Sequence, residues 1–306
     1  MSVATVATLE LAEAVELGYV LVARVADNVG ARALAIKGRV NEAHGLRAPR
    51  ASADADVLVE PTRLDDVVTG LLELGWRKVP TPSAPAFAYH SVTLNHPQWP
   101  CELDVHDRFP GFLAEPDVVF DALWAERTDL AAANVAVPAT GIYGSTLVMG
   151  LHALRTPSDQ RNGRELAGLV ERLSSERLNL ARLQDLASAT GCLATARPLL
   201  HELGVMVPHH PNGDRRIVEW EVRRSTAQTR NLGWLLAVRR TPPWRWPGIV
   251  LRAVLADEPY LRHFYPQAPT GKRGLWLARW WRLKVAFRDL PGAVGTARRL
   301  PGTGSR

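Results

Sequence analysis

Three stretches between Arg32 and Arg108 decide the fold of this chain. They are Ala33-Leu-Ala-Ile-Lys37-Gly38-Arg39, Ser52-Ala-Asp54-Ala-Asp56-Val-Leu-Val-Glu60 and Glu102-Leu-Asp104-Val-His106-Asp107-Arg108. Each lies on or beside an apolar or alternating run that predicts a β-strand. Because successive side chains of a strand point to opposite faces, Asp54 and Asp56 share one face of their strand, and Asp104 shares a face with His106. If these two strands are neighbours in a sheet, the three aspartates converge.

The convergence of three carboxylates has a chemical consequence. Like charges raise one another's pKa values unless a cation lies between them. Oxygen ligands of this kind suit Mg²⁺ or Mn²⁺ rather than zinc. The pattern therefore predicts a metal site with Asp54, Asp56 and Asp104 as ligands. The plainer interpretation is a solvated strand face or a set of helix-capping acids, which fits Asp65 or Asp66 better than two acids that precede a Val-Leu-Val run.

These motifs resemble those of the nucleotidyltransferase superfamily, which has the DNA polymerase β-like fold. The resemblance is closest to a bacterial subfamily with a Lys-Gly turn, an Arg-x-x-x-Asp-x-Asp-x-Leu-Val strand and a later Asp-x-His. Lys37 and Gly38 form the turn, and Asp104 with His106 fits the last motif. The strand motif is matched by Arg50, Asp54, Asp56, Leu58 and Val59.

The resemblance implies roles for these residues. Asp54 and Asp56 would hold the metals that bridge the nucleotide phosphates, and Asp104 would be the third ligand and the general base. Most of the superfamily has Gly-Ser at the turn, whereas Gly38 is followed by Arg39. The residues that contact the triphosphate are therefore left open among five candidates: Lys37, Gly38, Arg39, Arg50 and Ser52.

Composition and periodicity predict a fold of the α/β (α+β) class. The chain has 306 residues, of which 46% are hydrophobic and 22% are charged, enough for one large or two moderate domains. We expect a small mixed-sheet nucleotidyltransferase core over residues 1–140, and a helical substrate or accessory domain over 141–306. The predicted helices cover residues 9–28, 115–126, 145–155, 161–174, 180–190 and 193–203. The predicted strands include 32–36 and an edge strand at 134–138. A hairpin is predicted to join a strand at 87–94 to a strand at 101–106.

The last part of the chain is basic and rich in tryptophan. Nine of the residues from Lys272 onward are Lys or Arg, and Asp289 is the single acid among them. Trp276, Trp280, Leu283 and Phe287 fall on one helical face. A basic amphipathic helix of this kind fits peripheral contact with an anionic membrane through residues 272–299, or contact with nucleic acid. We favour the plainer interpretation, in which this helix packs on the other predicted helices and its basic residues form a solvated rim.

Other features narrow the class of protein. Cys101 and Cys192 are too few for a disulfide framework, and the acidic first helix is not a signal peptide, so we expect a cytoplasmic protein. Dinucleotide-binding and Walker A motifs are absent from the sequence. The histidines at 90, 96, 209 and 210 lack metal-ligand spacing, and His152, alone on a helix, is more typical of a structural histidine.

The predicted function is metal-dependent transfer of a nucleoside monophosphate from a nucleoside triphosphate such as ATP to a hydroxyl or phosphate acceptor, with release of pyrophosphate. The partners are the triphosphate and an acceptor that the sequence leaves unidentified. The alternative is a catalytically silent nucleotidyltransferase-like module that binds a nucleotide or a partner, and the missing Gly-Ser keeps it open.

Overall fold

The computed structural model describes residues 9–80, 90–156, 159–175, 178–207, 214, 216–218, 220–221, 224, 241–248, 251 and 255–299. The chain divides into two compact units. The first contains residues 1–79 and 90–217, and the second contains residues 80–89 and 218–306. The boundary predicted at residue 140 falls within the first unit and stays a prediction. His209, His210 and the first residues of the predicted hairpin lie outside the described residues.

A seven-stranded mixed sheet forms the centre of the first unit, in the order β3-β4-β5-β2-β1-β7-β6. Its strands are β1 (Ala33–Ile36), β2 (Asp54–Val59), β3 (Arg77–Lys78), β4 (Ser91–Asn95), β5 (Glu102–His106), β6 (Thr128–Ala132) and β7 (Val135–Ala139). The central strands β2 and β5 run parallel, whereas β4 and β5 form the predicted antiparallel hairpin.

Helices α1 (Leu11–Asn28) and α3 (Leu64–Glu73) cover one face of the central strands. Alternation puts Ala55, Val57, Leu103 and Val105 into one apolar cluster with these helices. Gly18 of α1 lies so close to the sheet that an added Cβ would be 3.0 Å from Leu103 and 3.2 Å from Ala55. The even-numbered residues of β2 and β5 therefore lie on the opposite face, which is the face that the acids occupy.

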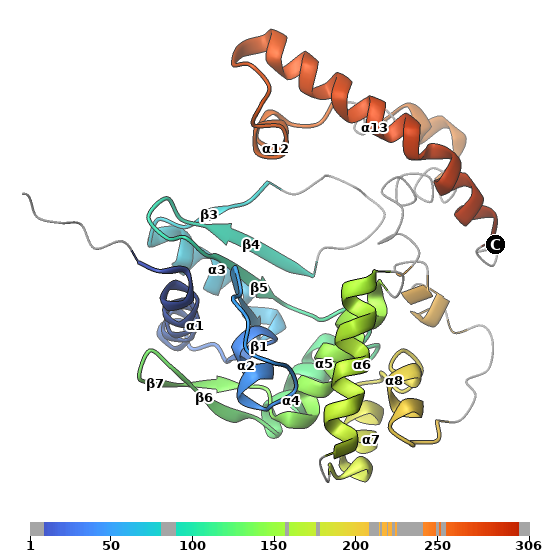
Figure 1. Ribbon diagram of the computed structural model, residues 1–306. Helices are drawn as coiled ribbons and strands as arrows, with labels where there is room; N and C mark the ends of the chain where they lie inside the picture. Colours follow the sequence, from blue (N-terminus) through green and yellow to red (C-terminus); the bar gives the residue numbers. More distant parts are fainter. Residues whose placement is uncertain are drawn as a thin grey trace, which may run out of the picture. The chain divides into compact units, whose positions relative to one another are not determined.

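The helices that follow β5 in the chain belong to the same unit. They are α4 (Pro116–Ala125), α5 (Ile142–Arg155), α6 (Gln160–Ser175), α7 (Leu180–Ala189) and α8 (Arg197–Glu202). Figure 1 shows α5 to α8 grouped beside one another. Helix α5 is the central member, since most of its residues are buried and it packs against α6, α7 and the short α2 (Gly38–Ala43).

The structure confirms the fold class, a mixed sheet followed by a helical region, and it corrects three details. β7 is internal, because β6 pairs along its outer side, so the predicted edge strand is wrong in position. The strand β6 itself was not predicted. The helix predicted over 193–203 is shorter than expected, since α8 begins at Arg197 after a turn rather than at residue 193.

The second unit contains η2 (Pro243–Arg245), α12 (Glu258–Phe264) and α13 (Gly271–Arg299). Its described apolar cluster consists of Leu261, Ala268 and Ala278, with Tyr260, Leu275 and Trp281 packed around them. Among the described residues, no helix is both long enough and apolar enough to cross a membrane.

Candidate active site

The register of the sheet brings the predicted acids together. Asp56 of β2 lies directly opposite Asp104 of β5, and Asp54 precedes Asp56 by two residues on the same face. Neighbours in register share a face, so the carboxylates of Asp56 and Asp104 are side by side. The register therefore brings Asp56 and Asp104 together. Asp54 has Glu102 as its register partner and lies outside the group of described ligand atoms that could share one ion.

Lys37 reaches the same place from β1. The last residue of that strand, Ile36, is the register partner of Asp56, and the chain turns at the next residue. Lys37 has a backbone φ of 55°, in the left-handed region that a non-glycine residue rarely adopts. The turn puts Lys37 Nζ 2.6 Å from Asp56 Oδ1. Strain of this kind concentrates at functional sites, which makes the turn part of the candidate site.

His106 completes the cluster. Its Nε2 lies 3.0 Å from Asp56 Oδ1 and 3.8 Å from Asp104 Oδ2. One ligand atom from each of Asp56, Asp104 and His106 lies within 4.8 Å of the others, so the group could hold a metal ion. His106 belongs to the Asp-x-His motif, but no role in the site was predicted for it. The Asp-x-His spacing, which puts both side chains on one face of β5, was the signal that could have found it.

The pKa values of Asp56 and Asp54 are shifted in opposite directions. Burial by itself raises the pKa of Asp56, but the Lys37 ammonium and the His106 bond outweigh burial and hold that pKa at about 2. The pKa of Asp54 is raised, first by burial and then by the charge of Asp56. A bound cation would remove the repulsion that raises the pKa of Asp54.

The remaining contacts orient the acids. Ser52 Oγ donates to Asp54 Oδ1 at 3.0 Å, and Thr93 Oγ1, whose residue is the register partner of Asp104 on β4, donates to Asp104 Oδ1. The side chain of Asp104 is 23% exposed, compared with 5% for Asp56. Asp104 is therefore the acid of this pair that a substrate can reach more readily.

The two arginines predicted to contact phosphate are paired with glutamates that are not part of the acid cluster. Arg39 pairs with Glu16 of α1 and with Glu42 of α2. Arg50 pairs with Glu165 of α6. Lys37 and Ser52 are in direct contact with the acids, whereas Arg39 and Arg50 have their contacts elsewhere.

Two further histidines lie near the site. The ring of His90 stacks on that of His106, with centroids 5.8 Å apart. His152 of α5 is largely buried, and its Nδ1 has no hydrogen-bond partner among the described residues. Burial lowers the pKa of His152 to about 4, and the charges of Lys37 and Arg155 act in the same direction. His152 is therefore neutral at pH 7.

No protein-family model and no curated protein matches the chain. Among solved structures, the antibiotic-resistance factor ANT(2'')-Ia is similar over 61% of this chain and 96% of its own, with 14% identity and a TM-score of 0.40. An antigenic nucleotidyltransferase-like protein from Paracoccidioides brasiliensis is similar over 66% of this chain and 97% of its own, with 19% identity and a TM-score of 0.40. A tRNA-processing enzyme matches at a TM-score of 0.25 with 12% identity, over 92% of this chain and 100% of its own.

The mixed sheet carries two acids on one strand, a third acid on the parallel neighbour and a lysine turn beside them, which is the arrangement that the motifs predict. The buried group of Asp56, Asp104 and His106 is chemically suited to a divalent cation, since it offers carboxylate oxygens and an imidazole nitrogen together.

Proposed function

We propose that this protein is a metal-dependent nucleotidyltransferase, which moves a nucleoside monophosphate from a nucleoside triphosphate to a hydroxyl or phosphate acceptor and releases pyrophosphate. The observation that carries the proposal is the register of β2 and β5, which puts Asp56 opposite Asp104 beside the Lys37 ammonium. Three acids and one lysine on a rigid sheet suit phosphoryl chemistry, in which positioning and charge neutralisation do most of the work.

The metal ligands in this proposal are Asp54, Asp56 and Asp104, with Mg²⁺ or Mn²⁺ as the ion and His106 beside them. The ion would neutralise charge on the phosphates. Lys37 would bind a phosphate oxygen as a point charge once its contact with Asp56 is exchanged for the nucleotide. Asp104, the more exposed acid of the register pair, would accept the proton of an acceptor hydroxyl.

The nucleotide-binding residues of the proposal are Lys37, Gly38, Arg39, Arg50 and Ser52. Lys37 and Ser52 have the strongest support, because each contacts one of the acids. Arg39 and Arg50 would have to leave their partners on α1, α2 and α6 before they could contact a triphosphate.

The test is calorimetric titration of ATP, GTP, CTP and UTP with and without Mg²⁺ into the wild type and Asp54→Asn. We expect Mg²⁺-dependent binding of at least one triphosphate, weakened at least ten-fold in the variant, without loss of thermal stability, because the substitution removes repulsion at a half-buried acid. Asp65→Asn, at an exposed acid of α3, is the matched control and should bind as the wild type does. Equal binding by Asp54→Asn would disprove the assignment.

The silent-module alternative has one observation in its favour. Arg39, which stands where most of the superfamily has a serine, has no hydroxyl to offer the acids, and its guanidinium is paired with Glu16 and Glu42. Triphosphate binding without pyrophosphate release in the presence of candidate acceptors would favour this alternative.

A further inference from the structure

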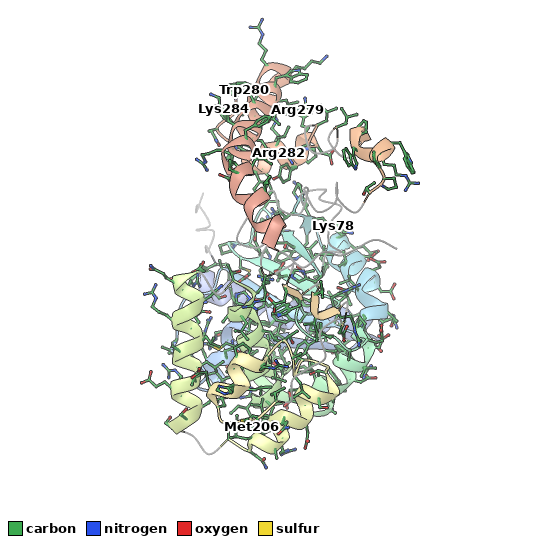
Figure 2. All side chains as sticks on the ribbon, turned by 90° about the vertical axis from the view of Figure 1, so that its right-hand side faces the viewer. Lys78, Met206, Arg279, Trp280, Arg282 and Lys284 are labelled. Carbon is green, nitrogen blue, oxygen red and sulfur yellow. The ribbon has the colours of Figure 1, made fainter. Side chains whose placement is uncertain are left out.

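Helix α13 has one face that packs within its own unit and one that does not. Ala278, Leu275 and Trp281 pack with Leu261 of α12. The opposite face is exposed. We call it the aromatic–basic face, and its residues recur every three or four positions: Arg273, Trp276, Leu277, Trp280, Lys284, Phe287 and Arg288. Figure 2 shows Arg279, Trp280, Arg282 and Lys284 projecting from this helix.

The exposure of this face is unusual for side chains of this size. Trp276 is 61% exposed, Trp280 is 55% exposed and Phe287 is 69% exposed. Three large exposed rings on one side of a helix form a group of apolar side chains, and such groups mark interaction sites more often than isolated apolar residues do. Cations flank the rings, with Lys284 Nζ 5.5 Å from the centre of the Trp280 ring.

The net charge of residues 272–306 indicates which kind of partner this face binds. Residues 272–306 contain nine Lys or Arg and one Asp, and without them the formal net charge of the chain changes from +6 to −2. The positive charge of the whole protein is therefore concentrated in this segment. A partner that complements it must be anionic.

The apolar composition favours a lipid surface over a nucleic acid. Single-stranded nucleic acids stack on aromatic rings, but exposed aliphatic side chains add little to that mode. Here Leu277 and Leu290 are exposed on the same helix, and Leu251 and Leu255 are exposed in the same unit. Arg279 also lies over the Trp276 ring, 5.1 Å from its centre, where a base would otherwise stack.

We infer that α13 docks on an anionic phospholipid surface through its aromatic–basic face. Tryptophan prefers the headgroup level of a bilayer, and Lys and Arg beside it attract acidic lipid headgroups. The helix lies in the interface in this arrangement, which agrees with the finding that no described helix is suited to cross a membrane.

The experiment is flotation of the full chain with two kinds of vesicle, phosphatidylcholine alone and phosphatidylcholine mixed with phosphatidylglycerol. The wild type should float with the mixed vesicles and much less with the neutral ones. One variant, Trp276→Ser with Trp280→Ser, removes two rings. A second, Arg273→Glu with Lys284→Glu, reverses two charges at exposed positions and keeps the rings.

Each surface cation is worth about a five-fold factor in partitioning, so the charge variant should bind at least about ten-fold more weakly. The ring variant should lose binding to a similar degree. The matched control, Leu74→Ser with Met206→Ser, removes two exposed apolar side chains from the first unit and should bind as the wild type does. Circular dichroism checks that each variant retains its helix content.

Three results would overturn the inference. They are failure of the wild type to float with mixed vesicles, equal flotation of the wild type and both variants, and equal binding to neutral and mixed vesicles. A parallel titration with a fluorescent single-stranded oligonucleotide tests the other anionic partner. Tight oligonucleotide binding that is lost in both variants, without flotation, would assign the face to nucleic acid instead.

Discussion

Asp56 is the residue on which the contacts of the candidate site converge. One of its carboxylate oxygens, Oδ1, contacts both Lys37 Nζ and His106 Nε2. Two donors to one oxygen keep the carboxylate ionised despite its burial. Removal of either donor leaves a buried charge with one partner fewer. Lys37 and His106 therefore position Asp56 in this structure.

Glu126 gives a residue-level prediction on stability. Its Oε1 accepts from the backbone N–H of Gly144 at the start of α5, at 3.0 Å. Burial raises the pKa of Glu126 from 4.5 to about 7, although these N–H contacts act against the shift. A raised folded-state pKa means that the folded protein favours the protonated carboxyl. The free energy of unfolding should therefore fall as the pH rises from about 4.5 to about 7.

The substitution Glu126→Gln isolates this effect, because glutamine keeps an accepting oxygen and cannot ionise. Between pH 4.5 and pH 8 the wild type should lose on the order of 1 to 3 kcal/mol more stability than the variant. Urea titrations at a series of pH values measure the difference. Glu171→Gln, at an exposed acid of α6, is the control and should follow the wild type. The same pH dependence of the free energy of unfolding in the wild type and in Glu126→Gln would contradict the prediction.

At the scale of elements, the turn between β1 and α2 sets the position of Lys37. Gly38 has a φ of 25°, and a Cβ added there would lie 2.7 Å from Tyr19 Oη of α1. The buried tyrosine hydroxyl donates to the Ile36 carbonyl at 3.5 Å. Helix α1 therefore packs directly against the turn. A residue larger than glycine at position 38 fits only if the Tyr19 side chain or the turn moves.

Gly38→Ala should destabilise the protein by about 1 to 3 kcal/mol through strain and contact with Tyr19. Adding Tyr19→Phe removes the hydroxyl, so the double variant should lose less stability than the two single changes together predict. Chemical denaturation of the four proteins measures the coupling. Gly163→Ala, in open space on α6, is the control and should be neutral or stabilising. If the stability losses of Gly38→Ala and Tyr19→Phe simply add in the double variant, residue 38 and the Tyr19 hydroxyl are not in contact.

At the scale of the whole molecule, the candidate site and the basic helix belong to different compact units. All eight predicted site residues lie within residues 37–104, in the first unit, and α13 lies in the second. Each unit has its own apolar cluster. The proposed nucleotide binding and the proposed surface docking should therefore be separable.

A chain that ends at Gly271 tests this separation. It should bind triphosphate with an affinity within about two-fold of the full chain, because the ligand residues are retained, and it should no longer float with acidic vesicles. Calorimetry and flotation on the same preparation measure both. Loss of triphosphate binding by a folded truncated chain would show that the second unit contributes to the site.

The local pattern of apolar and polar residues was sufficient to predict most of the helices and strands. The two-residue alternation of Asp54 and Asp56, and of Asp104 and His106, predicted the strands and the faces of their side chains. The position of β7 was wrong and β6 was missed, because strand order depends on pairing between distant segments. A short run such as residues 128–132 has no strong period of its own.

The sequence by itself determined which side chains share a face, since that depends only on the backbone geometry of a strand. It also determined that the positive charge is concentrated after residue 271. Only the tertiary structure decided that Asp56 is the buried acid, that His106 contacts it and that Arg39 and Arg50 pair elsewhere. Those outcomes depend on the parallel register of β2 with β5 and on helices from distant parts of the chain, and contacts between distant segments arise only when the chain packs.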